Sequence, residues 1–284
     1  MLEELAELRR FHFLLGRLVV RELKVRYVNS VFGFVWSIVP PLLQVIVFTF
    51  LFRSVLHNPC RNYSAYVLCG LIPWTFLNSS TMDAGQSLIE NYLVIRKVYI
   101  PREVIPLSVV IANFIHFALA WALYFTAFFG VARLIGIDLP VKPTLLYFPL
   151  ITLVLVCFTV GLSLWVSALS MFYDDVRFIL QTVFQLGFFI VPVVVPADLF
   201  RYTRLAQHHP GLYTLYMLNP ITSVIDAYRK TILEPVPLGS FQMKGAPVEL
   251  NWTLFAGAAG IAVFTLVGGY AYFNSRKWLF VERG

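Results

Sequence analysis

Apolar residues occur in long runs separated by polar stretches, and this spacing predicts helices that cross a membrane. A bilayer core needs about 20 consecutive apolar residues in a helix. Six segments meet this requirement, at about 31–56, 64–85, 105–132, 145–171, 176–196 and 252–274. The fifth is the shortest, and Gly187, Pro192 and Pro196 interrupt it. The pattern therefore predicts an all-α membrane protein with six transmembrane helices in a single domain, 1–284.

A different pattern precedes the first apolar run, over about residues 4–29. On a helical projection, Arg10, Arg17, Arg21 and Lys24 lie on one face, and leucine and valine side chains lie opposite. This arrangement is typical of an amphipathic helix that lies in the membrane interface with its cationic face toward the headgroups. An ordinary juxtamembrane anchor has the same pattern, so both interpretations stay open.

The polar segment at about 86–104 separates the second and third apolar runs. It is too polar to be buried in lipid, and Pro101 and Pro106 interrupt it. Arg96, Lys97, Arg102 and Glu103 are expected to give it exposed charge. We expect a structured cytoplasmic element that contacts another molecule. A solvated loop whose basic side chains reach back to the interface is the alternative.

The outer segment 197–251 is also expected to contain helices. Asn219 followed by Pro220 is a helix-start signal, with asparagine as N-cap and proline at the first helical position. Apolar residues then recur at helical spacing from Ile221 to Ile232, while Asp226 and Arg229 belong to the other side. With the short apolar stretch before it, this segment predicts a helical hairpin at about 212–234 that dips into the outer leaflet.

Composition supports the membrane interpretation and sets an orientation. The chain is 59% hydrophobic and 13% charged, with a mean hydropathy of +0.75, whereas soluble domains contain about 25% charged residues. The net charge of +7 is concentrated beside the apolar runs and forms no basic stripe on a soluble fold, which argues against nucleic acid as a partner. Most Lys and Arg lie in the segments on the same side of the membrane as the N-terminus, and few lie in the short loops on the other side, so both termini are expected in the cytoplasm.

The sequence lacks the motifs of a nucleotide-binding site or a hydrolase. It contains no GxxxxGK[ST], HExxH or GxSxG. Asp83, Asp174 and Asp175 are interpreted as helix-capping or interface residues, and His116 stands alone as a relay candidate. We therefore expect no catalytic site, no metal and no cofactor bound by this chain. A protein of this kind that moves a substrate must take its energy from a partner.

Aromatic residues mark a candidate path through the membrane, and its named positions are Phe32, Phe34, Trp36 and Phe188. Sugar rings stack on aromatic faces, which suits a pore for glycans. Interfacial aromatic belts explain such residues equally well in any membrane protein. Pro40 and Pro41 are expected to kink the first span and open space beside it.

The last apolar run carries small residues at spacings that allow close helix packing. These are Ala256 with Gly260, and Gly268 with Gly269. The pattern fits contacts within one chain and contacts between two copies.

Three stretches resemble one known family. The segment RELKVRYVNSVFGFVWSIVPPLLQVIVFTFLF (21–52) resembles the start of the membrane subunit of type-2 ABC exporters for bacterial surface polysaccharides. ENYLVIRKVYIPREVIPLS (90–108) resembles that family's segment before the third span, which includes its coupling helix. LNPITSVIDAYRKTIL (218–233) resembles its outer helical element. The resemblance runs along essentially the whole chain.

The resemblance implies the permease of an ATP-driven exporter in the bacterial inner membrane, which moves lipid-linked O-antigen, capsule or teichoic acid outward. Such a subunit forms a homodimer above two copies of a separate ATPase, which binds ATP and Mg²⁺. A type-2 exporter of drugs or lipids is the closest alternative. A membrane-embedded scaffold or glycan-modifying enzyme is a more distant one, and the scarcity of paired carboxylates argues against the enzyme.

The resemblance also implies roles for residues. The N-terminal helix is a gate helix, and the substrate's diphosphate is drawn to Arg10, Arg17, Arg21, Lys24 or Arg26. The ATPase contacts are expected at Arg96, Lys97, Arg102 and Glu103. The outer gate is expected at Asn219, Pro220, Asp226 and Arg229.

Overall fold

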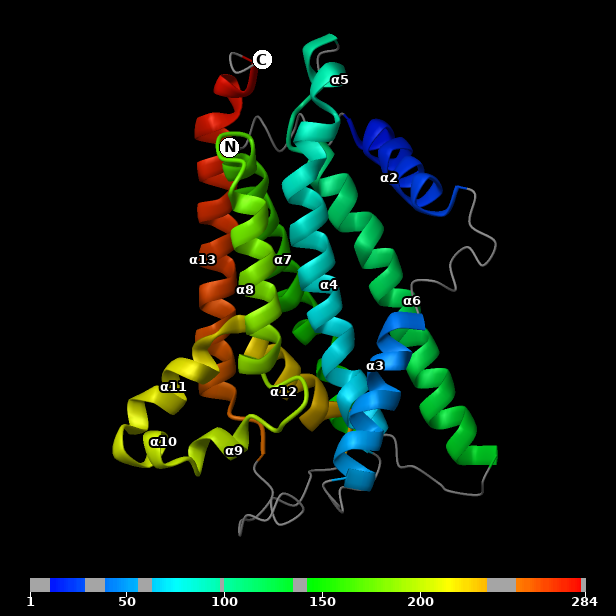
Figure 1. Ribbon diagram of the computed structural model, residues 1–284, viewed down its shortest axis with the longest axis vertical. Coiled ribbons are helices and arrows are strands. Elements are labelled where there is room, and N and C mark those ends of the chain that lie inside the picture. The colour runs from blue at the N-terminus through cyan, green and yellow to red at the C-terminus, as the bar shows by residue number, and fades with distance from the viewer. Residues whose placement is uncertain are drawn as a thin grey trace.

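The computed structural model describes residues 11–28, 39–55, 63–97, 100–134, 142–233 and 249–281, and within these ranges every regular element is a helix. The longer helices are α2 His12–Tyr27, α3 Val39–Thr49, α4 Tyr63–Glu90, α6 Val104–Leu134, α7 Phe148–Ser170, α8 Val176–Ile190, α12 Pro220–Ile232 and α13 Trp252–Arg276. The shorter ones are η2 Phe50–Val55, α5 Tyr92–Lys97, η3 Pro143–Tyr147, α9 Asp198–Arg201, α10 Arg204–His208, α11 Pro210–Leu218 and η5 Lys277–Val281. They form a bundle with α5 and η5 at one end and α9, α10 and α11 at the other (Figure 1).

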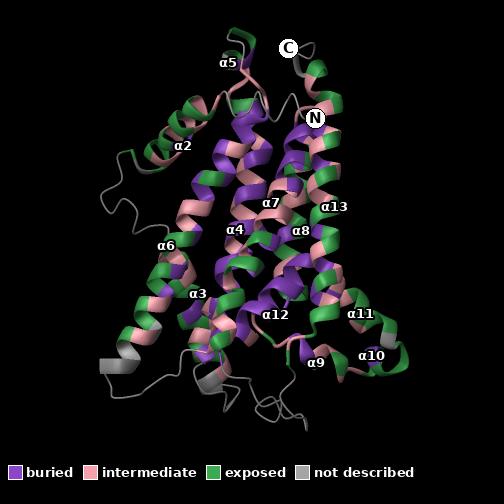
Figure 2. Cartoon of the chain, turned by 180° about the vertical axis from the view of Figure 1, so that it is seen from behind, coloured by how far each residue is buried: buried purple, intermediate pink, exposed green. Residues whose placement is uncertain are grey.

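Helix α4 is the centre of the bundle. It packs against α3, α6, α7, α8 and α12, and 17 of its 28 residues are buried. Figure 2 shows the same contrast, because α4 and α12 are largely buried whereas α2 and α13 carry many exposed residues. A helix that is covered by its neighbours does not need an apolar surface toward lipid, so α4 tolerates Asn78, Ser79, Ser80 and Asp83 along its length.

Among the described residues, three helical segments are long and apolar enough to cross a membrane: Val104–Ala127, Pro143–Ser170 and Trp252–Leu279. They coincide with the predicted spans at 105–132, 145–171 and 252–274. The first predicted span, 31–56, is described only from Val39 to Val55. The kink expected at Pro40 and Pro41 falls at the edge of the described residues and stays a prediction.

Helix α8 ends before the predicted boundary at 196. Its 15 residues extend over about 22 Å, which is less than the roughly 30 Å of a bilayer core. Val191 closes the helix by donating its N–H to the carbonyl of Gly187 at 2.8 Å, and its backbone is extended. The residue before a proline avoids the helical conformation, so Pro192 accounts for this end.

Helices α7 and α13 touch through their backbones. A Cβ atom at Gly161 of α7 would lie 2.5 Å from the carbonyl oxygen of Thr265, and one at Gly269 of α13 would overlap the carbonyl oxygen of Gly161. Only glycine permits this approach. Gly269 therefore makes a contact within one chain. Gly260 differs, because a Cβ atom there would meet nothing within 4 Å.

Helix α2 packs against α6 at the α5 end of the bundle (Figure 1). It corresponds to the predicted helix at 4–29, of which residues 4–10 lie outside the described part. Val19 is 7% exposed, and Leu15 and Leu23 are partly buried, whereas Arg17 and Lys24 are exposed. The apolar face predicted from the sequence is thus the face that carries the buried side chain of α2.

Candidate functional site

Three side chains form a closed polar ring where the C-terminal end of α2 meets α4 and α6. Arg26 Nη2 donates to Asp83 Oδ2 at 2.6 Å, and Arg26 Nη1 donates to Asn113 Oδ1 at 2.8 Å. Asn113 Nδ2 completes the ring by donating to Asp83 Oδ2 at 3.0 Å. Asn113 is buried, while the side chains of Arg26 and Asp83 are 37% and 40% exposed.

The ring borders a cavity of about 820 Å³ between α3, α4 and α6. Arg26, Asp83, Asn113 and His116 line its polar part. The other walls are mostly apolar and include Pro41, Leu42, Leu68, Ile72, Phe76, Phe117, Ala120 and Leu123. A cavity with one charged region and long apolar walls suits an amphipathic ligand.

A second contact ties α2 to the segment that leads into α5. Arg21 Nη2 donates to Asn91 Oδ1 at 2.8 Å, and Asn91 Nδ2 donates to the carbonyl of Ser87 at 2.8 Å. Arg21 also pairs with its neighbour Glu22 at 2.6 Å. Asn91 lies between α4 and α5. This contact joins α2 to the residue that precedes α5.

The charges around α5 differ in their exposure. Arg96 and Lys97 are exposed, and Arg96 lies over the ring of Tyr92 at 5.6 Å. Glu103 is buried and accepts from Lys277 Nζ at 3.2 Å. Arg102 lies over the ring of Trp278 at 5.7 Å. Arg102 and Glu103 join the start of α6 to η5, so Arg96 and Lys97 are the exposed members of the four predicted contacts.

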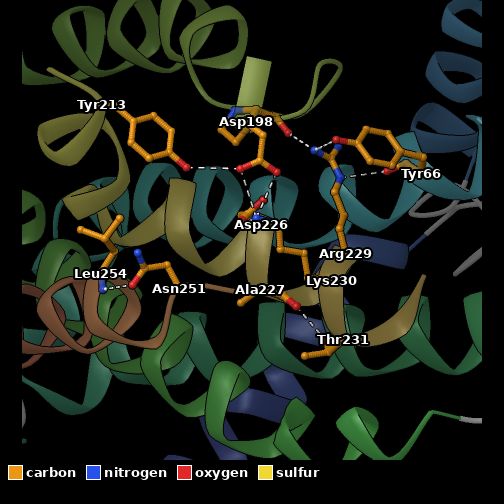
Figure 3. A network of polar contacts seen from close by, with 11 residues as sticks. Tyr66, Asp198, Tyr213, Asp226, Ala227, Arg229, Lys230, Thr231, Asn251 and Leu254 are labelled. Atoms are coloured by element: carbon orange, nitrogen blue, oxygen red, sulfur yellow. Dashed lines mark hydrogen bonds and ion pairs between the residues drawn. The ribbon is translucent and has the colours of Figure 1, made fainter. Parts of the chain in front are cut away.

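Arg229 of α12 binds the end of α8 and the first turns of α4 (Figure 3). Its guanidinium donates to the carbonyls of Pro192 and Val193, to the carbonyl of Tyr66 at 3.2 Å and to the Tyr66 hydroxyl at 2.9 Å. It also lies 3.7 Å from the centre of the Tyr66 ring. Since Arg229 is only 4% exposed, this contact is part of the protein interior.

A buried ion cluster lies beside Arg229 (Figure 3). Lys230 Nζ is 2.9 Å from Asp226 Oδ2 and 3.1 Å from Asp198 Oδ2. Tyr213 donates its hydroxyl to Asp198 Oδ1 at 3.2 Å. The cluster connects α9, α11 and α12.

The start of α12 is as predicted. Asn219 Oδ1 accepts from the N–H of Ile221 at 3.2 Å, and Pro220 is the first helical residue. The helix is buried on its polar side as well as its apolar side, because Thr222, Asp226 and Arg229 are all at most 5% exposed. Asn219 and Pro220 thus fix where the helix begins, and Asp226 and Arg229 fix what it binds.

The long apolar helices indicate a membrane protein, and sequence comparison identifies its family. The sequence profile of the family described as ABC-2 type transporter matches residues 14–233. The chain belongs to the ABC-2 type transporter family. It is accordingly a multi-pass membrane protein.

Relatives of this ABC-2 transporter match it along most of their length. The O-antigen export system permease protein RfbA of Klebsiella pneumoniae is 29% identical over 265 residues, which cover 92% of this chain and 91% of that protein. The protein of the same name from Myxococcus xanthus is 28% identical over 236 residues, covering 82% and 85%. The polysialic acid transport protein KpsM of Escherichia coli is 21% identical over 272 residues, covering 92% of each chain.

The remaining residues predicted for the ABC-2 transporter fall into two groups. Arg10, Phe32, Phe34 and Trp36 lie outside the described residues. Phe188 of α8 is partly buried and stacks with Phe48 at 5.8 Å, and it meets Trp74 edge to face at 6.2 Å. It therefore packs between α3, α4 and α8 in a single copy of the chain.

Asp83 and Asn113 were not predicted as site residues. Asp83 caps no helix, because α4 continues for a further two turns to Glu90 and its carboxylate pairs with Arg26. The available signal was the presence of an asparagine within an otherwise apolar predicted span, since polar groups in membrane helices are costly and usually paired. Their shared partner, Arg26, is 57 residues from Asp83 and 87 residues from Asn113 in the sequence, so no local pattern indicated the ring.

Proposed function

We propose that this ABC-2 transporter is the membrane subunit of an ATP-driven exporter that moves a lipid-linked polysaccharide from the cytoplasmic to the outer side of the inner membrane. The observation that carries the proposal is the similarity to O-antigen export permeases over nine-tenths of both chains. KpsM, a relative named for polysialic acid transport, supports a glycan as the substrate class. The α5 end is cytoplasmic in this proposal, and both termini lie there.

The proposed function is tested by deleting the gene and measuring surface polysaccharide. Loss of the polymer from the cell surface, with lipid-linked polymer accumulating inside, is the expected result. The purified subunit should retain a separate ATPase whose hydrolysis increases when lipid-linked glycan is added. Normal surface polymer in the deletion strain would exclude this function.

The substrate approaches along α2 in this proposal. Arg17 and Lys24 are exposed, whereas Arg21 and Arg26 pair with other parts of the protein. Exposed cations at the membrane surface attract phosphate groups and contribute about 1 kcal/mol each near an anionic surface. Arg17 and Lys24 therefore capture the diphosphate, and Arg26 receives it at the cavity.

Reversal of both exposed charges, Arg17→Glu with Lys24→Glu, should reduce export at least tenfold, because two attractive contacts become repulsive. Surface polymer is measured by blotting, and copurification of the ATPase should be unchanged. Reversal of Arg201 and Arg204, two exposed arginines at the opposite end, is the matched control. Export at the normal rate in the Arg17 and Lys24 variant would contradict a role for α2 in capture.

Arg96 and Lys97 are the proposed contacts for the ATPase, because they are exposed in the last turn of α5. In the double variant Arg96→Glu with Lys97→Glu, the ATPase should no longer copurify, since charge reversal at an interface rim opposes association. The purified variant should keep its melting temperature. If the complex stays intact, the ATPase docks elsewhere.

A homodimer is proposed to use α3 and α8. Both helices carry large exposed apolar side chains, including Ile46 and Val47 on α3 and Leu186 and Phe189 on α8. Glutamine side chains are exposed among them at positions 44, 181 and 185. Lipid would leave these amides unpaired, which is costly in a bilayer. A second copy and a polar path between the two copies would satisfy them, and this supports placing the glycan route there.

The outer gate is proposed to consist of α11 and α12 moving together. The buried bonds of Arg229 and Lys230 hold α12 to α8 and α9, so the hairpin moves only with the end of α8. Opening of the exit thus depends on a shift of α8, which is the helix proposed to face the partner copy.

A further inference from the structure

Asp83 occupies a position that suits a phosphate oxygen. Its Oδ2 atom accepts from Arg26 Nη2 at 2.6 Å and from Asn113 Nδ2 at 3.0 Å. A guanidinium and a buried amide that converge on one anionic oxygen are a typical donor set for phosphate. A phosphate from outside the protein can therefore take the place of the Asp83 carboxylate.

The surroundings of this donor set restrict the anion to a lipid. Arg26 and Asn113 line the polar part of the 820 Å³ cavity, and Phe76, Phe117 and Leu123 line its apolar walls. A phosphate bound at Arg26 would have these walls available for a hydrocarbon chain. A soluble phosphate would use the polar part alone and leave the apolar walls uncovered.

Exchange of the two anions is inexpensive. The side chains of Arg26 and Asp83 are 37% and 40% exposed, and partly exposed ion pairs contribute little to stability. Water can solvate the Asp83 carboxylate when its ion pair with Arg26 breaks. The diphosphate offers more oxygen acceptors and more negative charge than one carboxylate, so it competes well for the guanidinium.

Displacement of Asp83 also has a structural consequence. Arg26 ties α2 to the bundle through Asp83 and Asn113, and Arg21 adds a tie to Asn91, immediately before α5. When Arg26 binds a lipid phosphate instead, α2 loses its tie to Asp83, while the contact of Arg21 with Asn91 remains. The change is transmitted to the start of α5, where the ATPase is proposed to dock.

We propose that Arg26 and Asn113 form a binding site for the phosphate of a polyprenyl-diphosphate lipid, and that Asp83 is an internal competitor that keeps α2 docked until this lipid displaces it. The inference rests on the proposed function, because it takes such a lipid as the anchor of the exported glycan. It adds a site, a competitor and a route by which substrate binding reaches the ATPase.

The test uses the complex of this subunit with its ATPase in phosphatidylcholine nanodiscs, titrated with undecaprenyl diphosphate while ATP hydrolysis is measured. Asp83→Asn should lower the half-stimulating lipid concentration about two- to fivefold, because the competing ion pair is lost. Arg26→Gln should raise it. Asp175→Asn is the matched control, since Asp175 is exposed and makes no side-chain cap bond.

A second measurement follows α2 directly by the distance between spin labels at Val20 and Leu119, which are 47% and 43% exposed. The wild-type distance should be narrow without lipid and broad with undecaprenyl diphosphate, and Asp83→Asn should be broad without it. Phosphatidylglycerol at the same mole fraction should leave the wild type narrow; an equal response would overturn a site specific for the diphosphate lipid.

The two levels of proposal fail separately. If Asp83→Asn changes neither the half-stimulating concentration nor the label distance while lipid-linked glycan still stimulates the wild type, the site is overturned and the exporter function stands. If the deletion strain exports its polymer normally, the function itself is overturned.

Discussion

Replacing Arg229 with alanine should destabilise this transporter more than any other change to a single charged residue described above. The guanidinium donates hydrogen bonds to the carbonyls of Tyr66, Pro192 and Val193, and Arg229 is 4% exposed. Alanine leaves these carbonyls without a donor in a region that excludes water, at about 1–3 kcal/mol for each unsatisfied group. We expect a loss of about 3 kcal/mol, allowing for relaxation of the backbone.

A loss of that size corresponds to a fall in melting temperature of about 5 °C for a protein of this length. The measurement is thermal unfolding of the purified subunit in detergent, followed by size-exclusion chromatography. Arg201→Ala is the matched control, because Arg201 is exposed at the same end of the bundle. Its melting temperature should not change.

Arg229→Lys should give an intermediate result. An ammonium group can still donate to some of the carbonyls, but it lacks the planar fork and the stacking on Tyr66, whose ring centre is 3.7 Å from the guanidinium carbon. Melting temperatures of the alanine and lysine variants equal to wild type would show that Arg229 is not needed to hold α12 to α4 and α8.

Helix α12 shows which features the sequence could predict and which it could not. Asn219 and Pro220 determine the start of α12 through local backbone geometry, so the pattern alone was sufficient. The partners of Arg229 are backbone carbonyls of residues far away in sequence, and a carbonyl has no residue type to recognise. The burial of the polar side of α12 was therefore not predictable from its periodicity.

Helix lengths show the same limit. Apolar runs identified α6, α7 and α13, because lipid contact requires an apolar surface. Hydropathy did not indicate that α8 stops at Ile190, since Val191 and Val193–Val195 continue the apolar composition. The stop depends on backbone conformation before Pro192 and on the carbonyls that Arg229 then binds. Local chemistry and a distant partner together set the boundary.

The close crossing of α7 and α13 should tolerate no side chain. In Gly269→Ala, the new Cβ atom would overlap the carbonyl oxygen of Gly161, which is main chain and cannot rotate away. The helices must separate, and overpacking of this kind costs about 1–3 kcal/mol. Gly161→Ala should have the same effect, because its Cβ atom would lie 2.5 Å from Thr265 backbone. Both variants should melt several degrees below wild type.

Gly260→Ala gives the opposite expectation on the same helix. Its Cβ atom would meet nothing within 4 Å, and alanine is favoured over glycine within a helix by up to about 1 kcal/mol. The variant should melt at or slightly above the wild-type temperature in the isolated subunit. If Gly260→Ala destabilises the subunit while Gly269→Ala does not, the small residues of α13 serve a contact between copies, and the packing of α7 on α13 described here is incorrect.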